Sequence, residues 1–351
     1  GAPRDHAVRY RFRKRVNAAL ASTRGPEAVA KLIDRRVAAL ERAEALIEWE
    51  REREFADDLH ATVETIIREL GPLSPMHAVQ CLLRFVDTHP SVFDRIDDSS
   101  GRIQDVYWQA ADAIPEFVAK LAPGELAELP ERLTVSLSRD THGLALQITT
   151  AVVSLLPQPL LLAWDKELSG KSDSKRSGVP IPYLDVRRVV AGALGDLDGL
   201  MAIEAQLPAW RQNPLEVAER LLGAKRLEEA LVWARKERKG DLAFASTVDL
   251  ADGRINRLHD LDRVRLEAKI LEAMKEPKAA QILRWATFEA TLNTGILRDY
   301  IGRLDDFLEQ EELDEAFAIA ARSKMSYVAL AFFIEWPRLD LAAQFVLDRK
   351  S

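Results

Sequence analysis

The chain has 351 residues, of which 47% are hydrophobic and 30% are charged. Its 49 basic and 56 acidic side chains leave a net charge of −7, which argues against a general polyanion binder but still allows a local basic patch. The single cysteine, Cys81, excludes an intramolecular disulfide framework and favours the reducing cytoplasm. The apolar stretches fall far short of the roughly 20 residues that span a bilayer, so we expect a cytoplasmic protein without a membrane partner.

Apolar residues recur at helical spacing along almost the whole chain, and no run has the convincing alternation of a strand. One stripe follows Gly25-Pro26, and another covers residues 55–70 and stops at Gly71-Pro72. Ser74-Pro75 opens a further helix, and helical spacing resumes at Ile103 after a turn-rich connection. These signals predict an all-α fold.

Residues 169–178 have the composition of a linker, with glycine, serine and basic residues but no side chain able to anchor a core. They predict a boundary between an N-terminal helical segment, residues 1–168, and a C-terminal repeat segment, residues 179–351. In the second segment, residues 214–223 and 227–238 form a predicted helical pair, and short connections favour antiparallel neighbours.

The stretch beginning Leu227-Glu228-Glu229-Ala230-Leu231 has an altered counterpart in Leu313-Asp314-Glu315-Ala316-Phe317. Small residues at such places let neighbouring helices approach, as in the second helix of a stacked hairpin. The tetratricopeptide pattern is matched only in part, because the large aromatics of the first helix and the terminal proline are missing. We therefore expect an alpha-alpha superhelix (solenoid) of stacked helical hairpins, similar to tetratricopeptide or HEAT repeats.

Three stretches carry a family resemblance: residues 83–101, Gly25-Pro26-Glu27-Ala28 leading to Trp49, and residues 331–340. In content and order they resemble a large family of bacterial proteins classified only as a domain of unknown function. The resemblance covers nearly all of the chain and implies an all-helical, repeat-like body, with no activity to transfer. Members of that family typically extend further at both ends, so the resemblance implies a shortened chain.

The loop 94–101 carries the densest polar cluster outside the predicted helices, including Asp94, Arg95, Asp97 and Asp98. We select these four residues as the first candidate binding site, because function concentrates in positioned loops. The favoured alternative is structural, with an aspartate or serine capping the next helix. A further alternative is a metal-dependent hydrolase in which these aspartates converge with His89, although the spacing does not match a calcium loop.

A basic segment near the start includes Arg11, Arg13, Lys14 and Arg15, with Tyr10 and Phe12 interleaved. Such residue types could contact phosphates and stack on bases, so nucleic-acid binding is the alternative function. The opposing interpretation pairs this segment with the acidic stretch over residues 41–58, within one chain or between subunits of a homo-oligomer.

No nucleophile elbow, phosphate-binding loop or dinucleotide fingerprint is present in the sequence. His77 and Cys81 lie four residues apart and could supply two zinc ligands, but a buried, unreactive thiol explains Cys81 more simply. We therefore expect a non-enzymatic scaffold that binds a protein or peptide partner, with no cofactor and no metal. The partner and the oligomeric state stay open.

Overall fold

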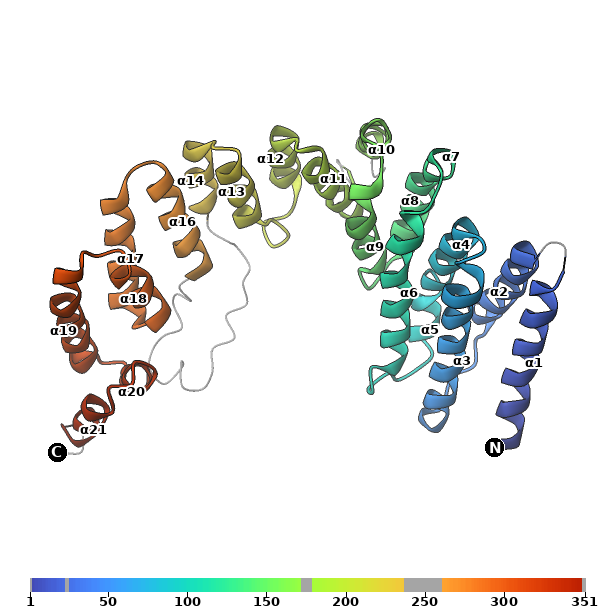
Figure 1. Cartoon of the computed structure of the whole chain (residues 1–351), viewed down its shortest axis with the longest axis horizontal. Coiled ribbons are helices and arrows are strands. Elements are labelled where there is room, and N and C mark those ends of the chain that lie inside the picture. Colours follow the sequence, from blue (N-terminus) through green and yellow to red (C-terminus); the bar gives the residue numbers. More distant parts are fainter. Residues whose placement is uncertain (1, 23–24, 172–178, 237–260, 349–351) are drawn as a thin grey trace. The chain divides into compact units, whose positions relative to one another are not determined.

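The computed structural model describes residues 2–22, 25–171, 179–236 and 261–348, without the side chains of residues 2–10 and 306. The described part is helical, and its only β-type pairing is an isolated bridge between Ile47 and Ile96 (Figure 1). The all-α prediction is therefore confirmed. Contacts between Cα atoms divide the chain into two compact units, Gly1–Ile203 and Glu204–Ser351.

The first unit is a series of helices that pack on neighbours one to three α-helices further along the chain. Its elements are α1 (Ala2–Leu20), α2 (Gly25–Arg42), η1 (Trp49–Arg51), α3 (Glu52–Thr65), η2 (Ile66–Leu70), α4 (Pro75–Val86), α5 (His89–Phe93), α6 (Arg102–Val118), α7 (Pro123–Leu126), α8 (Leu129–Arg139), α9 (Leu144–Val152), η3 (Val153–Leu155), α10 (Gln158–Gly170), α11 (Ile181–Leu194) and α12 (Leu197–Gln206), which crosses the division. Helix α2 contacts α1 and α4, α6 contacts α3, α4 and α9, and α11 contacts α9 and α10.

Helical periodicity explains how these elements bury one face. On α2, Val29, Ile33 and Val37 recur every four residues and are fully buried. The same kind of stripe on the following helices builds one hydrophobic core, which extends along the chain from Val29 to Val190.

The prediction of a linker from residue 169 is wrong for Ser169 and Gly170, which are the last two residues of α10, and its residues 172–178 lie outside the described residues. The two helices beside this segment, α10 and α11, pack against each other within the first unit. Arg187 on α11 forms an ion pair with Asp165 on α10, with 2.8 Å between Nε and Oδ1. The contact-based division falls instead between Ile203 and Glu204, so a domain boundary at 169–178 stays a prediction.

The second unit continues with shorter helices. They are α13 (Pro214–Gly223), α14 (Leu227–Ala234), α16 (Leu261–Ala273), α17 (Pro277–Thr291), α18 (Thr294–Ile301), α19 (Asp306–Arg322), α20 (Ser326–Glu335) and α21 (Leu339–Asp348). The predicted pair of residues 214–223 and 227–238 corresponds to α13 and α14, but α14 ends at Ala234, earlier than predicted, and positions 237–238 lie outside the described residues. The main core of this unit joins residues of α16–α21.

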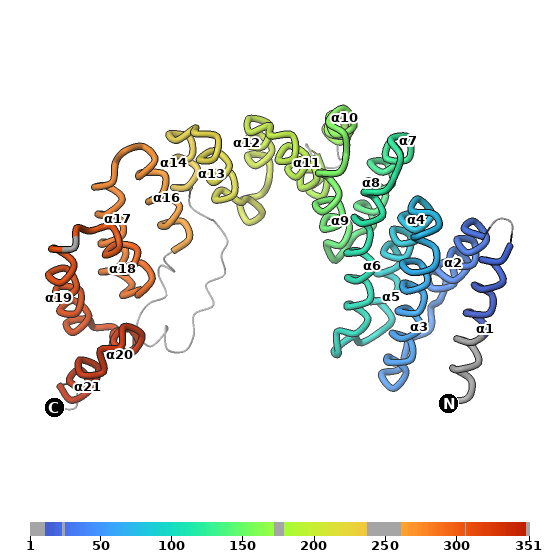
Figure 2. The backbone as a smooth tube through the Cα atoms, in the orientation of Figure 1, coloured from blue at the N-terminus to red at the C-terminus, as the bar shows by residue number. Residues whose placement is uncertain are grey.

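One turn geometry joins consecutive helices at four places: α11–α12, α13–α14, α16–α17 and α20–α21 (Figure 2). Each turn has an N–H that donates to a carbonyl five residues earlier, at N···O distances between 2.8 and 3.0 Å. The donors are Asp196, Arg226, Glu276 and Arg338. The residue before each donor has a positive φ: 69° at Gly195, 62° at Lys225, 63° at Lys275 and 23° at Pro337. At Gly195, Lys225 and Lys275 a second hydrogen bond from the residue's own N–H, to the carbonyl three residues earlier, completes the Schellman ending of a helix. Pro337 has no N–H, so its turn has the first hydrogen bond alone.

We call residues 191–200, 221–230, 271–280 and 333–342 the repeated hairpin turns. Four residues after each donor comes a buried residue whose N–H bonds the donor's own carbonyl, namely Leu200, Ala230, Ala280 and Ala342. The equivalents of Leu227 are therefore the first residues of α12, α17 and α21. Leu313 lies inside α19, so the sequence match between Leu227 and Leu313 does not join equivalent positions.

Candidate functional site

A groove between α1 and α2 brings four arginines together. Arg11 and Arg15, four residues apart on α1, lie on one side of it, and Arg35 and Arg36 of α2 lie on the other. Phe12 and Leu32 complete the lining of the groove, whose volume is about 380 Å³. The buried positions Ile33 and Val37 of α2 face the core, which leaves the intervening arginines toward the groove. We call this the arginine groove.

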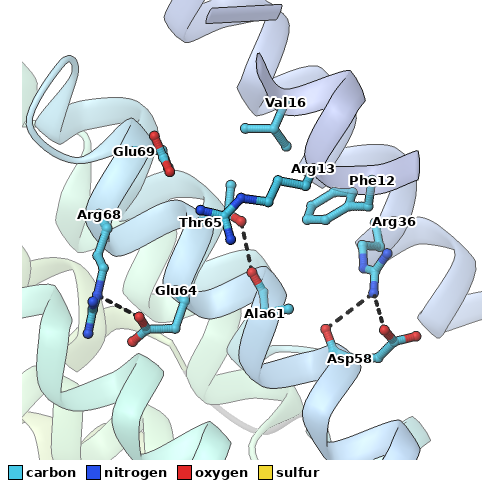
Figure 3. A pocket seen from close by; sticks show the side chains of 10 residues that line it. All are labelled: Phe12, Arg13, Val16, Arg36, Asp58, Ala61, Glu64, Thr65, Arg68 and Glu69. Atoms are coloured by element: carbon cyan, nitrogen blue, oxygen red, sulfur yellow. Dashed lines mark hydrogen bonds and ion pairs between the residues drawn. The ribbon is translucent and has the colours of Figure 1, made fainter. Parts of the chain in front are cut away.

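Arg36 is fixed in place at the inner edge of this groove. Its Nη2 atom donates to the backbone oxygen of Asp58 at 3.2 Å and lies 3.3 Å from the Oδ1 atom of the same residue (Figure 3). Its guanidinium also stacks over the ring of Phe12, 4.4 Å from the centroid. Arg36 therefore joins α1, α2 and α3 and forms a rigid wall of the groove.

A second hollow of about 300 Å³ lies on the other side of Phe12 and Arg36, between α1 and α3. Arg13 points into it from α1, and the carboxylates of Asp58, Glu64 and Glu69 also line it (Figure 3). Glu64 is already paired with Arg68, with 2.5 Å between Oε2 and Nε. The hollow is therefore mixed in charge, unlike the arginine groove.

The predicted basic set thus divides between two surfaces. Arg11 and Arg15 line the arginine groove, Arg13 lines the mixed hollow, and Lys14 is exposed and lines neither. The sequence interpretation did not include Arg35 and Arg36, although they are adjacent arginines in a helix with a clear apolar stripe. That stripe could have placed both on the exposed side, but only the packing of α1 on α2 shows that they face Arg11 and Arg15.

Among the described side chains, the acidic stretch over residues 41–58 neutralises only Arg36 of the groove. Glu41 lies 3.7 Å from Arg84 of α4, and Asp58 pairs with Arg36. No carboxylate among the described side chains forms an ion pair with Arg11, Arg15 or Arg35. The side chains of Arg4, Arg9 and Tyr10 lie outside the described residues, so their pairing with the acidic stretch stays a prediction.

Asp98 of the loop 94–101 caps the helix that follows it. Its Oδ1 accepts from the N–H of Ile103 at 3.1 Å, and its Oδ2 accepts from that of Gln104 at 2.8 Å. Gly101, with a φ of 74°, provides the left-handed turn into α6. Asp140 and Gly143 (φ 83°) begin α9 in the same way, where Asp140 accepts from three backbone N–H groups. The shared Asp-x-x-Gly spacing was a readable signal for both caps.

Arg95 is buried, and its side chain donates hydrogen bonds to three backbone carbonyls. Its Nε donates to the carbonyl of Ser91 at 2.8 Å, Nη1 to that of Ala45 at 3.3 Å and Nη2 to that of Leu40 at 3.2 Å. The backbone oxygen of Arg95 in turn accepts from Ile47 at 2.9 Å. The residue therefore holds the segment after α2 against α5 and directs its charge inward.

The remaining loop residues do not gather around one point. Asp94 is exposed, and Asp97 accepts hydrogen bonds from the backbone and hydroxyl of Ser99. His89 is buried beside Asp140, with 3.6 Å between Nε2 and Oδ1, and its Nδ1 lies 3.0 Å from the carbonyl oxygen of Val86. Within the described part of the chain, no three His, Cys, Asp or Glu side chains are arranged to hold a metal ion. The geometry gives no support to the metal-dependent hydrolase.

His77 and Cys81 have separate surroundings. The Nδ1 atom of His77 lies 2.7 Å from the hydroxyl of Ser74, and Cys81 is buried in the first core. Burial is the main reason that the pKa of the Cys81 thiol rises to about 12, so the thiolate is not populated near neutral pH.

The fold and these sites define an all-helical chain with recurrent hairpin turns and a local arginine cluster. Residues 7–182 and 183–351 match the family described as "Family of unknown function (DUF6880)", and the chain belongs to that family. No curated protein and no solved structure matches the chain. No helix in the described part is long and apolar enough to cross a membrane.

Proposed function

We propose that this chain is a non-enzymatic helical-repeat scaffold, a solenoid of stacked hairpins that binds a protein or peptide partner. The repeated hairpin turns carry this proposal. A similar turn recurs at four places, and three of the helix pairs that it joins, α13–α14, α16–α17 and α20–α21, pack against each other, as in arrays of stacked hairpins that resemble tetratricopeptide repeats. Such arrays present extended surfaces on which partners bind.

Two hairpins also expose a large apolar side chain at the same place. Val232 on α14 and Ile282 on α17 each lie two residues after the buried alanine, and they are 62% and 70% exposed. Single exposed aliphatic side chains are common on protein surfaces, but these two occupy equivalent positions of two hairpins and offer a partner the same kind of contact. We therefore infer that the partner contacts these positions of the second unit.

The test is affinity capture with mass spectrometry, using the purified chain and lysate from its source. The double variant Val232→Ser/Ile282→Ser should lose the partners that the parent chain enriches. The matched control is Leu73→Ser/Leu162→Ser, which alters two exposed leucines of the first unit (57% and 53% exposed). Equal capture by both variants and the parent would contradict the assigned surface. No enrichment by the parent chain, together with turnover in a metabolite screen, would contradict the scaffold function.

A further inference from the structure

Three of the four arginines in the arginine groove carry a positive charge that no carboxylate among the described side chains compensates. Arg11 and Arg15 are like charges four residues apart on α1, an arrangement that destabilises a helix by a few tenths of a kcal/mol. Arg35 adds a third cation from the facing helix. None of the three pairs with a carboxylate among the described side chains. A bound anion would offset this repulsion and supply the missing acceptors.

We propose that the arginine groove binds a phosphorylated side chain of a protein partner, an inference that rests on the scaffold function proposed above. Guanidinium groups present paired N–H donors that match phosphate oxygens two at a time. A phosphorylated serine or threonine carries a charge of about −1.5 to −2 near neutral pH, against −1 for a carboxylate. Three unpaired arginines beside a fixed Arg36 therefore suit a phosphate better than a single carboxylate.

The distribution of charge favours a phosphorylated protein segment over a nucleic acid. A polynucleotide needs a continuous series of cations along its backbone. Here the basic side chains of α1 separate, because Arg13 lies with Glu64 and Glu69 in the mixed hollow and Lys14 lies outside both hollows. A compact groove of about 380 Å³ that has four arginines and no carboxylate in its lining suits one phosphate and an adjacent apolar contact to Leu32.

Binding can be tested on the full chain with a degenerate peptide library that has a fixed central phosphoserine or phosphothreonine. Its twin library has serine or threonine at the fixed position. We expect the chain to retain the phosphorylated library and not its twin. The variants Arg11→Ala/Arg15→Ala and Arg35→Ala should each lower retention at least tenfold. Arg11→Lys/Arg15→Lys should also lower it, because lysine keeps the charge but loses the paired donors.

The matched control is Arg13→Ala/Lys14→Ala, which removes the same charge from the same helix but leaves the groove intact. It should retain the library like the parent chain, with circular dichroism confirming that every variant is folded. Equal retention of both libraries, or equal loss in the control, would overturn the proposal. Binding of a thymidine oligonucleotide in preference to the phosphorylated library, abolished by the groove variants, would replace it with nucleic-acid binding.

Failure of the groove and failure of the scaffold function are distinguishable. The capture experiment depends on Val232 and Ile282 in the second unit, whereas the library experiment depends on arginines of the first. A chain that captures partners through the second unit but ignores phosphate would overturn only the phosphate inference. A chain that binds the phosphorylated library but captures no partner would contradict the scaffold function alone.

Discussion

At the scale of single residues, the charged side chains of the candidate loop have different tasks. Arg95 binds three backbone carbonyls, Asp98 caps a helix and Asp94 faces solvent. The sequence grouped them because they are close along the chain, but the charge and polarity of a residue do not reveal the direction of its side chain. The structure separates them by burial and by hydrogen-bond partners.

Replacement of Arg95 by alanine should lower the free energy of unfolding by about 3 kcal/mol, because three partly buried hydrogen bonds from a charged donor are lost. Urea denaturation followed by circular dichroism measures the change. Arg102→Ala is the matched control, since Arg102 is exposed at the start of α6, and its effect should stay within about 0.5 kcal/mol. A negligible change in the free energy of unfolding for Arg95→Ala would show that these three hydrogen bonds do not stabilise the fold.

At the scale of elements, the cap on α6 gives a second test. Asp98→Ala should cost about 1 to 2 kcal/mol, because two N–H groups in the first turn lose their acceptor, while Asp98→Asn should keep most of the stability. Asp94→Ala removes the same charge from an exposed position and should have little effect. Thermal melting of the parent with and without magnesium, manganese or zinc completes the experiment. Metal-dependent stabilisation that Asp94→Ala abolishes would contradict the structural interpretation of the loop.

Three elements of the second unit meet at Glu272 of α16. Its Oε1 atom lies 2.6 Å from Nη2 of Arg284 on α17 and 2.6 Å from Nε of Arg303, which follows α18. Partial burial raises the pKa of Glu272, but the hydrogen bonds and charges of the two arginines outweigh it and lower the pKa below the ordinary 4.5. The ionised carboxylate therefore stabilises the folded unit above the ordinary pKa, and this contribution is lost as the pH falls through the lowered pKa.

Glu272→Gln should accordingly lower the melting temperature at pH 7, and the difference from the parent should shrink as the pH falls well below 4.5. Thermal melts across the acid range measure this convergence. The exposed Glu289 of α17 provides the control variant Glu289→Gln. A difference between Glu272→Gln and the parent that stays constant with pH would rule out ionisation as its source.

Helical periodicity made most of the helices predictable from sequence, whereas the contacts between helices could not be predicted. The stripe at Val29, Ile33 and Val37 identified α2 from sequence, because each of these residues packs inward at helical spacing. The partners of Arg11 and Arg15 come from another helix, and no local pattern specifies which face of α2 meets α1. The repeated hairpin turn was also hidden, since its four left-handed positions are occupied by glycine, lysine, lysine and proline.

At the scale of the whole molecule, the first unit should fold by itself. Its main hydrophobic cluster joins described residues from Val29 to Val190, and further buried residues such as Val16, Leu200 and Ile203 also lie within residues 1–203. A fragment of residues 1–206, which keeps α12 whole, should be helical and unfold cooperatively. A fragment of residues 1–168, cut at the boundary predicted from composition, lacks Val186 and Val190 and should be less stable. Urea titrations of both fragments measure the difference, and equal stability would favour the earlier boundary.

Substitutions in the repeated hairpin turns should also raise the free energy of unfolding of the protein. Lys225 and Lys275 hold a left-handed backbone that costs a residue with a side chain about 1 to 2 kcal/mol, and Gly195 shows that glycine fits the same position. Glycine loses more chain entropy on folding, by about 0.4 to 1 kcal/mol, which offsets part of the gain.

Lys225→Gly and Lys275→Gly should each raise the free energy of unfolding by a few tenths to about 1 kcal/mol, measured by urea denaturation. Lys269→Gly, inside α16, should instead destabilise the chain by about 1 kcal/mol, so equal effects at all three lysines would refute the argument. Thermal tolerance could thus be engineered at the turns between helices, while the proposed binding positions Val232 and Ile282 keep their native side chains.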